Sequence, residues 1–460
     1  MKSYDIILIG TGQATGTILP SMLEAGLKVA VIEKDRVGGS CVNWGCTPTK
    51  TLVANAKVAS MISRSEDYGI DCPSFEVNFP EMMRSLNKTR DESEKSFREY
   101  LEKVTDFYSG SGSFKDDHTI DVEMNSGGIS AIRGETIIIH TGAKAIIPSL
   151  KGIGEVTYLT NRSLFSLKEL PRHLLIIGGS YIALEIGQIF RRLGSDVSIL
   201  EKNDRLIARE DRDISEGIQK VLEDEGISVW LNTQIEKVEK AGEGLCVTFG
   251  QNGIKRQEGA THLLAAVGRA AQSQDLHLER TGIETTEKGY IKINEYCQTS
   301  LEHVYALGDV NGEGAFTHTS VHDGQIFLDH YFKRGSRSLS SRTATYALYT
   351  DPPVGRVGMN EQEAKKTGKD VMVCEMPMSS IARAKEKKET QGKIKIVVDR
   401  KTDEILGATI FGVGGDELIG IINVMMQSHL PYSALQNTVI PHPTVGELIP
   451  FMFSSLRPLE

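Results

Sequence analysis

One pattern that occurs twice constrains the fold of this chain more than any other feature. Each copy has an apolar strand, a glycine-rich turn, a helix, a second strand and an acidic residue at the end of that strand. The first copy spans residues 5–33 and ends at Glu33, and the second spans residues 174–201 and ends at Glu201. In such a unit the glycines let the backbone approach a pyrophosphate at the helix N-terminus, and the acid accepts hydrogen bonds from ribose hydroxyls. The pattern therefore predicts two dinucleotide-binding domains in an α/β fold.

Both copies depart from the usual glycine spacing. In the first, GTGQATG, Thr15 stands where the third glycine is expected, which puts close packing of the helix on the strand in doubt. The second is reduced to Gly178, Ser180 and Ala183. Glu201 suits free ribose hydroxyls and repels a ribose phosphate, although basic residues follow it closely. We therefore expect the second site to favour NADH over NADPH.

The segment 38–50, GGSCVNWGCTPTK, places Cys41 and Cys46 where a helix is predicted to start. Thr47 and Thr49 are possible caps of this helix, because apolar residues recur after them at helical spacing. The positive field of a helix N-terminus lowers the pKa of a thiol, and two close thiols that cycle to a disulfide store two electrons. The alternatives are two buried cysteines or half of a zinc site, but zinc needs a second ligand pair that the sequence does not offer. We predict a redox pair and no metal site.

Length and composition bound the remaining choices. A chain of 460 residues is too long for one core and suggests about three domains. The net charge of −9 gives no reason to expect nucleic acid or a membrane surface as a partner, and no apolar run reaches the length of a membrane span. The N-terminus begins a strand without a signal peptide, and only one pair of the six cysteines is close in sequence. These features lead us to expect a cytoplasmic protein.

These motifs together resemble the FAD-dependent pyridine nucleotide–disulfide oxidoreductases, a family that includes dihydrolipoamide dehydrogenase, glutathione reductase and mercuric reductase. The cysteine segment is most similar to a mercuric-reductase-like branch with the pattern GGxCVNxGCTPTK. The resemblance implies two Rossmann-like domains, for FAD and NAD(P), and a C-terminal α+β dimerisation domain. The implied divisions are 1–150 for FAD and the redox disulfide, 151–270 for NAD(P), 271–338 for a central segment completing the FAD domain, and 339–460 for the interface.

The resemblance also implies roles for the reacting residues. Cys46 would be the thiol beside the flavin and Cys41 the thiol that attacks the substrate, while Lys50 would pair with Glu185 next to the flavin ring. In the family, FAD and NAD(P) bind at particular turns, and this chain has matching residues at those turns. The FAD residues would be Gly10, Gly12, Glu33, Gly39, Lys50, Thr141, Gly142, Gly308 and Asp309, and the NAD(P) residues Gly178, Gly179, Tyr181, Glu201 and Gly268.

Thiol–disulfide exchange also needs a group that moves protons, and a histidine does this near neutral pH. The segment HPTVGE supplies His442, with Glu447 five residues on to orient the ring. The resemblance implies that this histidine reaches the disulfide of the other subunit, so the active sites would be shared across a homodimer.

The chain is therefore expected to pass electrons from NAD(P)H through FAD and the Cys41–Cys46 disulfide to a small disulfide or related oxidant. The alternatives are a dihydrolipoamide dehydrogenase, a mercuric or other metal-ion reductase, a reductase of hypothiocyanite-type oxidants, and a non-catalytic flavoprotein subunit. The C-terminus FMFSSLRPLE lacks the cysteine pair of mercuric reductases, and His442 stands where they usually have tyrosine. Both departures argue against mercury, and the retention of every reacting group argues against a non-catalytic role.

Overall fold

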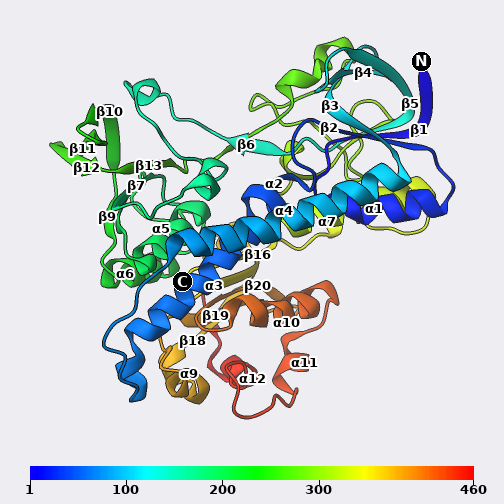
Figure 1. The fold of residues 1–460 in the computed structure, drawn as a ribbon. Coiled ribbons are helices and arrows are strands. Elements are labelled where there is room, and N and C mark those ends of the chain that lie inside the picture. Colours follow the sequence, from blue (N-terminus) through cyan, green and yellow to red (C-terminus); the bar gives the residue numbers. More distant parts are fainter. Residues whose placement is uncertain (460) are drawn as a thin grey trace.

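The first glycine pattern forms a parallel β-α-β unit, as seen in a computed structural model that describes residues 1–459 (Figure 1). Strand β1 (Lys2–Ile9) lies between β2 (Val29–Glu33) and β5 (Ile129–Ile139) and runs parallel to both. Its apolar residues are buried on both faces, as in most parallel sheets. The six-stranded sheet is completed by β3 (Asp106–Phe114), β4 (Thr119–Met124) and β15 (Val304–Ala306). A late segment of the chain thus returns to the first sheet.

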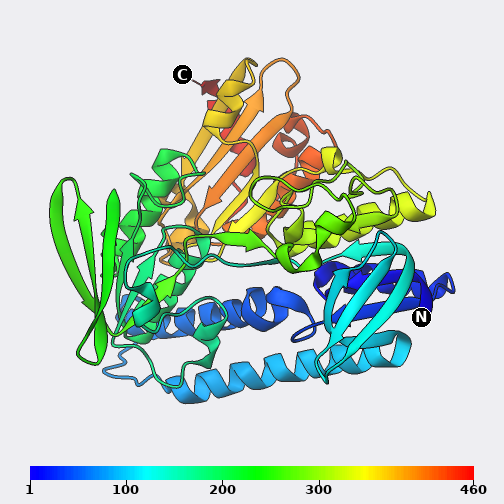
Figure 2. The ribbon, with the colours of Figure 1, turned by 90° about the horizontal axis from the view of Figure 1, so that it is seen from above.

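Long helices cover this sheet and carry the cysteines. Helix α1 (Gln13–Glu24) packs against α7 (Thr317–Phe332) beside the sheet. The short helix α2 (Gly39–Trp44) leads into α3 (Cys46–Ser63), and α4 (Phe79–Val104) packs along both. Figure 2 shows α3 and α4 running side by side beneath the second domain.

The second glycine pattern forms a smaller parallel sheet in the order β13-β7-β8-β9. Its strands are β7 (His173–Ile177), β8 (Asp196–Leu200), β9 (Ser228–Trp230) and β13 (His262–Ala265), with helices α5 (Tyr181–Leu193) and α6 (Arg212–Asp224). An antiparallel sheet of β10 (Thr233–Ala241), β11 (Gly244–Gln251) and β12 (Ile254–Ala260) adjoins it. The chain enters and leaves this domain through a paired ribbon of β6 (Ala143–Ala145) and β14 (Arg269–Ala271).

The C-terminal domain is a six-stranded antiparallel sheet in the order β16-β17-β20-β19-β18-β21. Its strands are β16 (Thr345–Leu348), β17 (Val354–Gly358), β18 (Val371–Pro377), β19 (Lys393–Asp399), β20 (Ile405–Phe411) and β21 (Arg457–Pro458). Its helices are α8 (Glu361–Lys366), α9 (Ala382–Glu386), α10 (Gly415–Gln427), α11 (Tyr432–Gln436) and α12 (Ile449–Met452). Helix α10 packs on β17 and β20.

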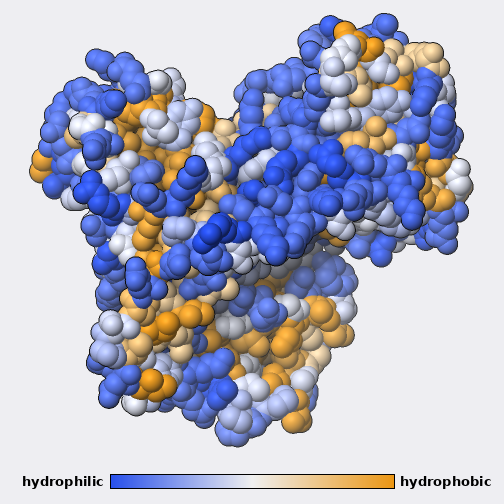
Figure 3. Space-filling model, viewed as in Figure 1, coloured by the Kyte–Doolittle hydropathy of each residue, from blue (hydrophilic) through white to orange (hydrophobic). Residues whose placement is uncertain are grey.

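Apolar side chains are exposed on this C-terminal domain. They include Ile421, Val424, Leu430, Val439 and Phe451. Figure 3 shows hydrophobic residues gathered on the lower part of the molecule, where this domain lies. Exposed apolar surface of this kind marks an interaction face. Within residues 1–459, no helix is both long and apolar enough to cross a membrane.

Candidate active site

Both glycine turns and both cysteines line a single cavity of about 2440 Å³. A pocket for one drug-sized ligand measures about 300–1,000 Å³, so this cavity has room for two extended ligands. Its wall also includes Glu33, Asp309, Glu201 and Lys50. The cavity therefore joins the two dinucleotide turns through the cysteine pair.

The first turn is packed so closely that only glycine fits at its key positions. Gly10 has φ +104°, and a Cβ there would lie 2.3 Å from the carbonyl oxygen of His140. A Cβ on Gly12 would lie 2.7 Å from the His140 ring, and one on Gly39 would lie 2.9 Å from the Cα of Gly12. The turn thus presents bare backbone to the cavity at the N-terminus of α1. This is the arrangement that a diphosphate requires, so the residues present fit FAD.

Thr15 stands inside the fold at the position where the pattern has its third glycine. Its side chain is fully buried, and its hydroxyl lies 3.3 Å both from the carbonyl oxygen of Gly10 and from Nδ1 of His140. Nε2 of His140 lies 3.0 Å from the Ser320 hydroxyl on α7. Burial lowers the pKa of His140 to about 4, so the ring is neutral. A hydroxyl and a buried imidazole fill the space that the usual third glycine leaves for close packing.

The second turn repeats this design on α5. Gly178 has φ +110°, and a Cβ there would lie 2.5 Å from a backbone carbonyl oxygen. The backbone N–H of Gly179 donates to Oε2 of Glu201 at 2.5 Å, and Gly268 closes the far wall with φ +132°. The Tyr181 ring lies on the cavity wall, edge-on to two neighbouring aromatic rings. The NAD(P) residues expected from the sequence therefore all line the cavity.

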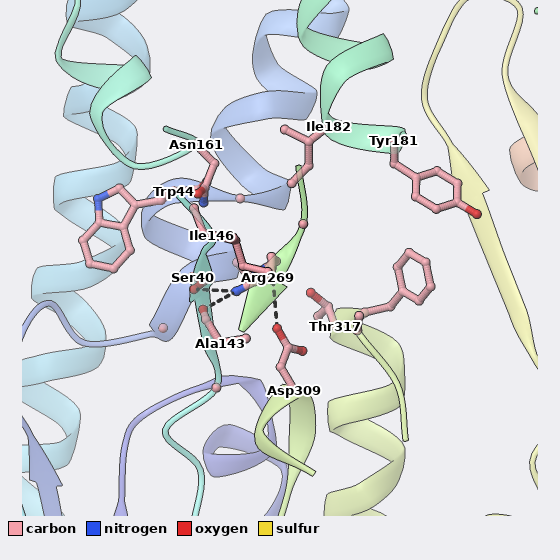
Figure 4. Close-up of a pocket in the computed structure, with 18 of the residues that line it drawn as sticks. Ser40, Trp44, Ala143, Ile146, Asn161, Tyr181, Ile182, Arg269, Asp309 and Thr317 are labelled. Atoms are coloured by element: carbon pink, nitrogen blue, oxygen red, sulfur yellow. Dashed lines mark hydrogen bonds and ion pairs between the residues drawn. The ribbon is translucent and has the colours of Figure 1, made fainter. Parts of the chain in front are cut away.

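Asp309 meets a partner that the sequence analysis did not select. Its Oδ2 lies 2.8 Å from NH1 of Arg269, whose NH2 donates to the carbonyl oxygen of Ala143 at 2.6 Å and to the Ser40 hydroxyl at 3.3 Å (Figure 4). Burial raises the pKa of Asp309, and the charge of Arg269 opposes this rise. Nε of Arg269 is buried without a hydrogen-bond partner in the described residues.

Of the other residues expected at FAD, Thr141 and Gly142 line the cavity, whereas Gly308 is buried and does not line it. The Thr141 hydroxyl donates to the carbonyl oxygen of Gln272 at 2.7 Å. This bond links the two segments that connect the first and second domains, next to the β6–β14 ribbon. Gly142 has φ +69° and Gly308 has φ +72°. A Cβ on Gly308 would lie 2.9 Å from the Ser320 hydroxyl, so this turn also requires glycine.

The N-cap of α3 is Gly45, which lies two residues before Thr47 and four before Thr49, the caps predicted from sequence. Gly45 precedes Cys46, the first residue of α3, and no side chain caps the helix, so Thr47 and Thr49 lie inside its first turn. The prediction of threonine caps is wrong because Gly45 turns back on the preceding helix. A Cβ on Gly45 would lie 2.8 Å from the carbonyl oxygen of Ser40. Cys41 accordingly lies in α2 rather than at the N-terminus of α3.

The two thiols are reduced in this structure and differ in acidity. The hydrogen bond from the Cys41 thiol lowers the pKa of Cys46 to about 6, against the opposing effect of burial. The Thr317 hydroxyl, 3.2 Å from Cys46 Sγ, and the charge of Lys50 lower it further. The same hydrogen bond, together with burial, raises the pKa of Cys41. The pair therefore holds its negative charge on Cys46. Thr317 had no local sequence signal, because it comes from a helix 271 residues later.

Lys50 and Glu185 lie next to this thiol. The Lys50 ammonium is 2.7 Å from Oε2 of Glu185, as the resemblance implied. The Glu185 side chain is 7% exposed and the Lys50 side chain 33%. A nearly buried carboxylate needs such a partner.

His442 and Glu447 meet each other but not the cysteines of their own chain. Nδ1 of His442 lies 2.8 Å from Oε2 of Glu447, which also accepts a hydrogen bond from the backbone N–H of Thr444 at 3.3 Å. Glu447 is 10% exposed and His442 is 76% exposed. Within residues 1–459, neither of them lines the cavity that holds Cys41 and Cys46. An oriented, solvent-facing histidine is thus available to a second molecule.

Comparisons with known proteins agree on one family. Residues 4–324 match the family model described as pyridine nucleotide-disulphide oxidoreductase, and residues 344–452 match its dimerisation domain. The chain is 34% identical to the probable pyridine nucleotide-disulfide oxidoreductase RclA of Escherichia coli, over 99% of this chain and 100% of that protein. It is 32% identical to a mercuric reductase of Lysinibacillus sphaericus, over 97% of this chain and 81% of that protein. A solved Cu(II) complex of the HOCl-induced flavoprotein disulfide reductase RclA superposes with a TM-score of 0.90 at 33% identity, covering 99% of this chain and 100% of that one.

Proposed function

The chain belongs to the pyridine nucleotide-disulphide oxidoreductase family, and we propose that it passes electrons from NAD(P)H to a small disulfide or related oxidant through FAD and the Cys41–Cys46 pair. It is an enzyme of the flavoprotein disulfide reductase type, and its dimerisation domain implies a homodimer. The observation that carries the proposal is the acidic Cys46 thiol, which lines the same cavity as both glycine turns.

The residues that we propose for the two cofactors come mainly from the two glycine turns, which line one cavity. The first turn, with Gly10, Gly12 and Gly39, would receive the diphosphate of FAD. When bound, FAD would supply the two-electron chemistry that links a reduced nicotinamide to a disulfide. The carboxylate of Glu201 supports NADH as the preferred nicotinamide cofactor, because it repels a ribose phosphate.

The two cysteines divide the substrate reaction between them. With the charge held on Cys46, Cys41 needs a base before it can attack. His442 of the partner subunit would take that proton, with Glu447 orienting its ring. Cys41 then forms a mixed disulfide with the substrate and releases one substrate thiolate, which takes the proton back. The Cys46 thiolate attacks the Cys41 sulfur, which releases the second half of the substrate as a thiolate and closes the Cys41–Cys46 disulfide.

Substrate identity can be tested directly with a steady-state screen of the purified protein. We would measure NADH oxidation with glutathione disulfide, hypothiocyanite and Hg(II), and NAD⁺ reduction with dihydrolipoamide. Cys41→Ser serves as the control that removes the attacking thiol. A disulfide or hypothiocyanite should be turned over by the wild type and not by Cys41→Ser. Turnover that is equal in both proteins would exclude the cysteine pair from the reaction.

Reduction of a soft metal ion is the second candidate function. It is supported by the similarity to a mercuric reductase and to a solved RclA that is a Cu(II) complex, and by thiolates being good ligands of soft metals. The same screen with Hg(II) and Cu(II) distinguishes this function from disulfide reduction. A metal-ion reductase should show NADH oxidation that depends on the metal and survives when all disulfide substrates are left out.

A further inference from the structure

The Lys50–Glu185 ion pair has a third member that comes from the C-terminal domain. Tyr349 follows strand β16, and its backbone N–H donates to Oε1 of Glu185 at 2.9 Å. The Lys50 ammonium lies over the Tyr349 ring, 4.5 Å from its centroid. The carboxylate therefore uses one oxygen for Lys50 and the other for the backbone of residue 349. The ammonium is held between a carboxylate and an aromatic face.

The segment that carries Tyr349 is fixed between two helices of the other domains. Two residues after Tyr349, Asp351 lies 2.7 Å from the Lys57 ammonium on α3 and 2.6 Å from the guanidinium of Arg192 on α5. Gln188 on α5 exchanges two hydrogen bonds with the backbone of Asp351, at 2.7 and 2.8 Å. Tyr349 thus contacts α3 and α5 through Lys50 and Glu185, and Asp351 contacts the same two helices through Lys57 and Arg192. The position of the Tyr349 ring is therefore set by the packing of all three domains.

The ion pair in turn faces the reacting thiol. The charge of Lys50 lowers the pKa of Cys46, and the charge of Glu185 raises it. The net influence on Cys46 depends on where the ammonium sits relative to the carboxylate. Cys41 from α2 also acts on this thiol, and Asp416 and Glu417 on α10 act on the Tyr349 hydroxyl from the C-terminal domain.

We propose that Tyr349 is a positioning residue that holds Lys50 against Glu185 beside Cys46, so that the C-terminal domain tunes the thiol of its own subunit. The inference rests on the proposed function in taking Cys46 as a reacting thiol. A lysine side chain has a flexible four-carbon stem. Without the Tyr349 ring, the Lys50 ammonium would be free to move toward water. Its effect on Cys46 would then be screened. The aromatic face, rather than the hydroxyl, is the part of Tyr349 that acts.

The test measures the thiol itself and needs no turnover. The thiol-reduced holoprotein is alkylated with iodoacetamide at a series of pH values, and modification at Cys46 is located by fragmentation of the tryptic peptide 37–50. Tyr349→Leu should raise the pH at which Cys46 alkylation is half-maximal by about half a pH unit, because a cation–π contact of ordinary strength is lost. Tyr349→Phe keeps the ring and should keep the wild-type midpoint. Every substitution at this position keeps the backbone N–H that Glu185 accepts.

A double-mutant cycle separates this role from a general disturbance of the fold. In a Lys50→Met background, where the tryptic peptide becomes 37–57, the pH midpoint for Cys46 alkylation is already raised, and Tyr349→Leu should add nothing. Tyr349→Met, which fills a similar volume without a ring, replaces Tyr349→Leu if that variant does not fold. An unchanged midpoint in Tyr349→Leu, or an equal shift in Tyr349→Phe, would overturn the inference. A protein that turned over no substrate but showed the Tyr349→Leu shift would refute the proposed function and leave this inference standing.

Discussion

Glu33 and Glu201 hold equivalent positions in two different domains. Oε2 of Glu33 accepts the backbone N–H of Thr11 at 3.1 Å, and Oε2 of Glu201 accepts that of Gly179 at 2.5 Å. Thr11 and Gly179 each follow the first glycine of their turn. The other oxygen of each carboxylate accepts the backbone N–H two residues further on, at 2.9 and 2.8 Å. Each acid therefore fixes its own glycine turn, in addition to any ribose hydroxyl it binds.

The purified protein should contain FAD, and Gly10→Ala should lose it. The new methyl group would collide with the backbone of His140 in a left-handed conformation that only glycine adopts easily. The measurement is flavin absorbance per subunit after purification, with the flavin released by denaturation. Gly16→Ala is the matched control, because Gly16 lies in α1 with open space around its Cβ. It should keep FAD and raise stability by about 0.5–1 kcal/mol. Full flavin occupancy in Gly10→Ala would contradict the placement of the cofactor.

NADH should be preferred over NADPH, and Glu201→Ala should narrow the preference. The substitution removes the charge that repels a ribose phosphate. It also leaves the Gly179 N–H without its acceptor, so binding of both cofactors should weaken. The measurement is kcat/KM for each cofactor in both proteins. A wild-type ratio that favours NADPH tenfold, about 1.4 kcal/mol, would reject this role of Glu201.

Alkylation of Cys46 should follow a thiol pKa near 6 rather than the ordinary value near 9. Thr317→Val removes a hydroxyl that stabilises the thiolate, so the midpoint should move to higher pH. Thr51→Val is the matched control, since the Thr51 hydroxyl bonds only within α3. Peptide-resolved alkylation across pH 4–10 measures both. A midpoint that Thr317→Val leaves in place would show that the 3.2 Å contact does not act on the thiolate.

His442→Ala should slow turnover of a disulfide substrate by about 10²–10⁴-fold, the usual contribution of a general acid–base group. The same variant should oxidise NADH at the wild-type rate when the electron acceptor is an artificial dye that does not react with the thiols. Glu447→Gln should show a smaller loss in the disulfide assay, because the ring keeps a neutral partner at Nδ1. Undiminished disulfide turnover in His442→Ala would remove the residue from the mechanism.

Mixed dimers test whether the active site is shared between subunits. Cys41→Ser and His442→Ala subunits are each inactive as homodimers. In a mixed dimer both defects fall in one site when the site is shared, and the other site is intact. Random reassociation of equal amounts should then restore activity at about a quarter of wild-type sites. No gain on mixing would show that His442 serves the cysteines of its own chain.

Several features of the fold could be read from sequence because they depend on neighbouring residues. The strand–turn–helix pattern around Gly10 and Gly178 follows from apolar runs and glycine turns, and the structure has a β-α-β unit at each position. The cap prediction at Thr47 and Thr49 failed because a tertiary turn at Gly45 determined where α3 begins. The surroundings of Thr15 could not be read from sequence either, because they include His140, which lies 125 residues away.

The sequence by itself determined the chemistry that this chain can carry: two dinucleotide turns, a close cysteine pair, and a histidine with a carboxylate nearby. Each of these is encoded within a few residues, so local spacing is enough to reveal it. Only the tertiary structure decided which groups tune that chemistry. Thr317, Arg269 and Tyr349 reach the site from distant segments, and nothing near them in sequence distinguishes them. Charge and hydrogen bonding act through space, and their effect on Cys46 exists only once the three domains have packed together.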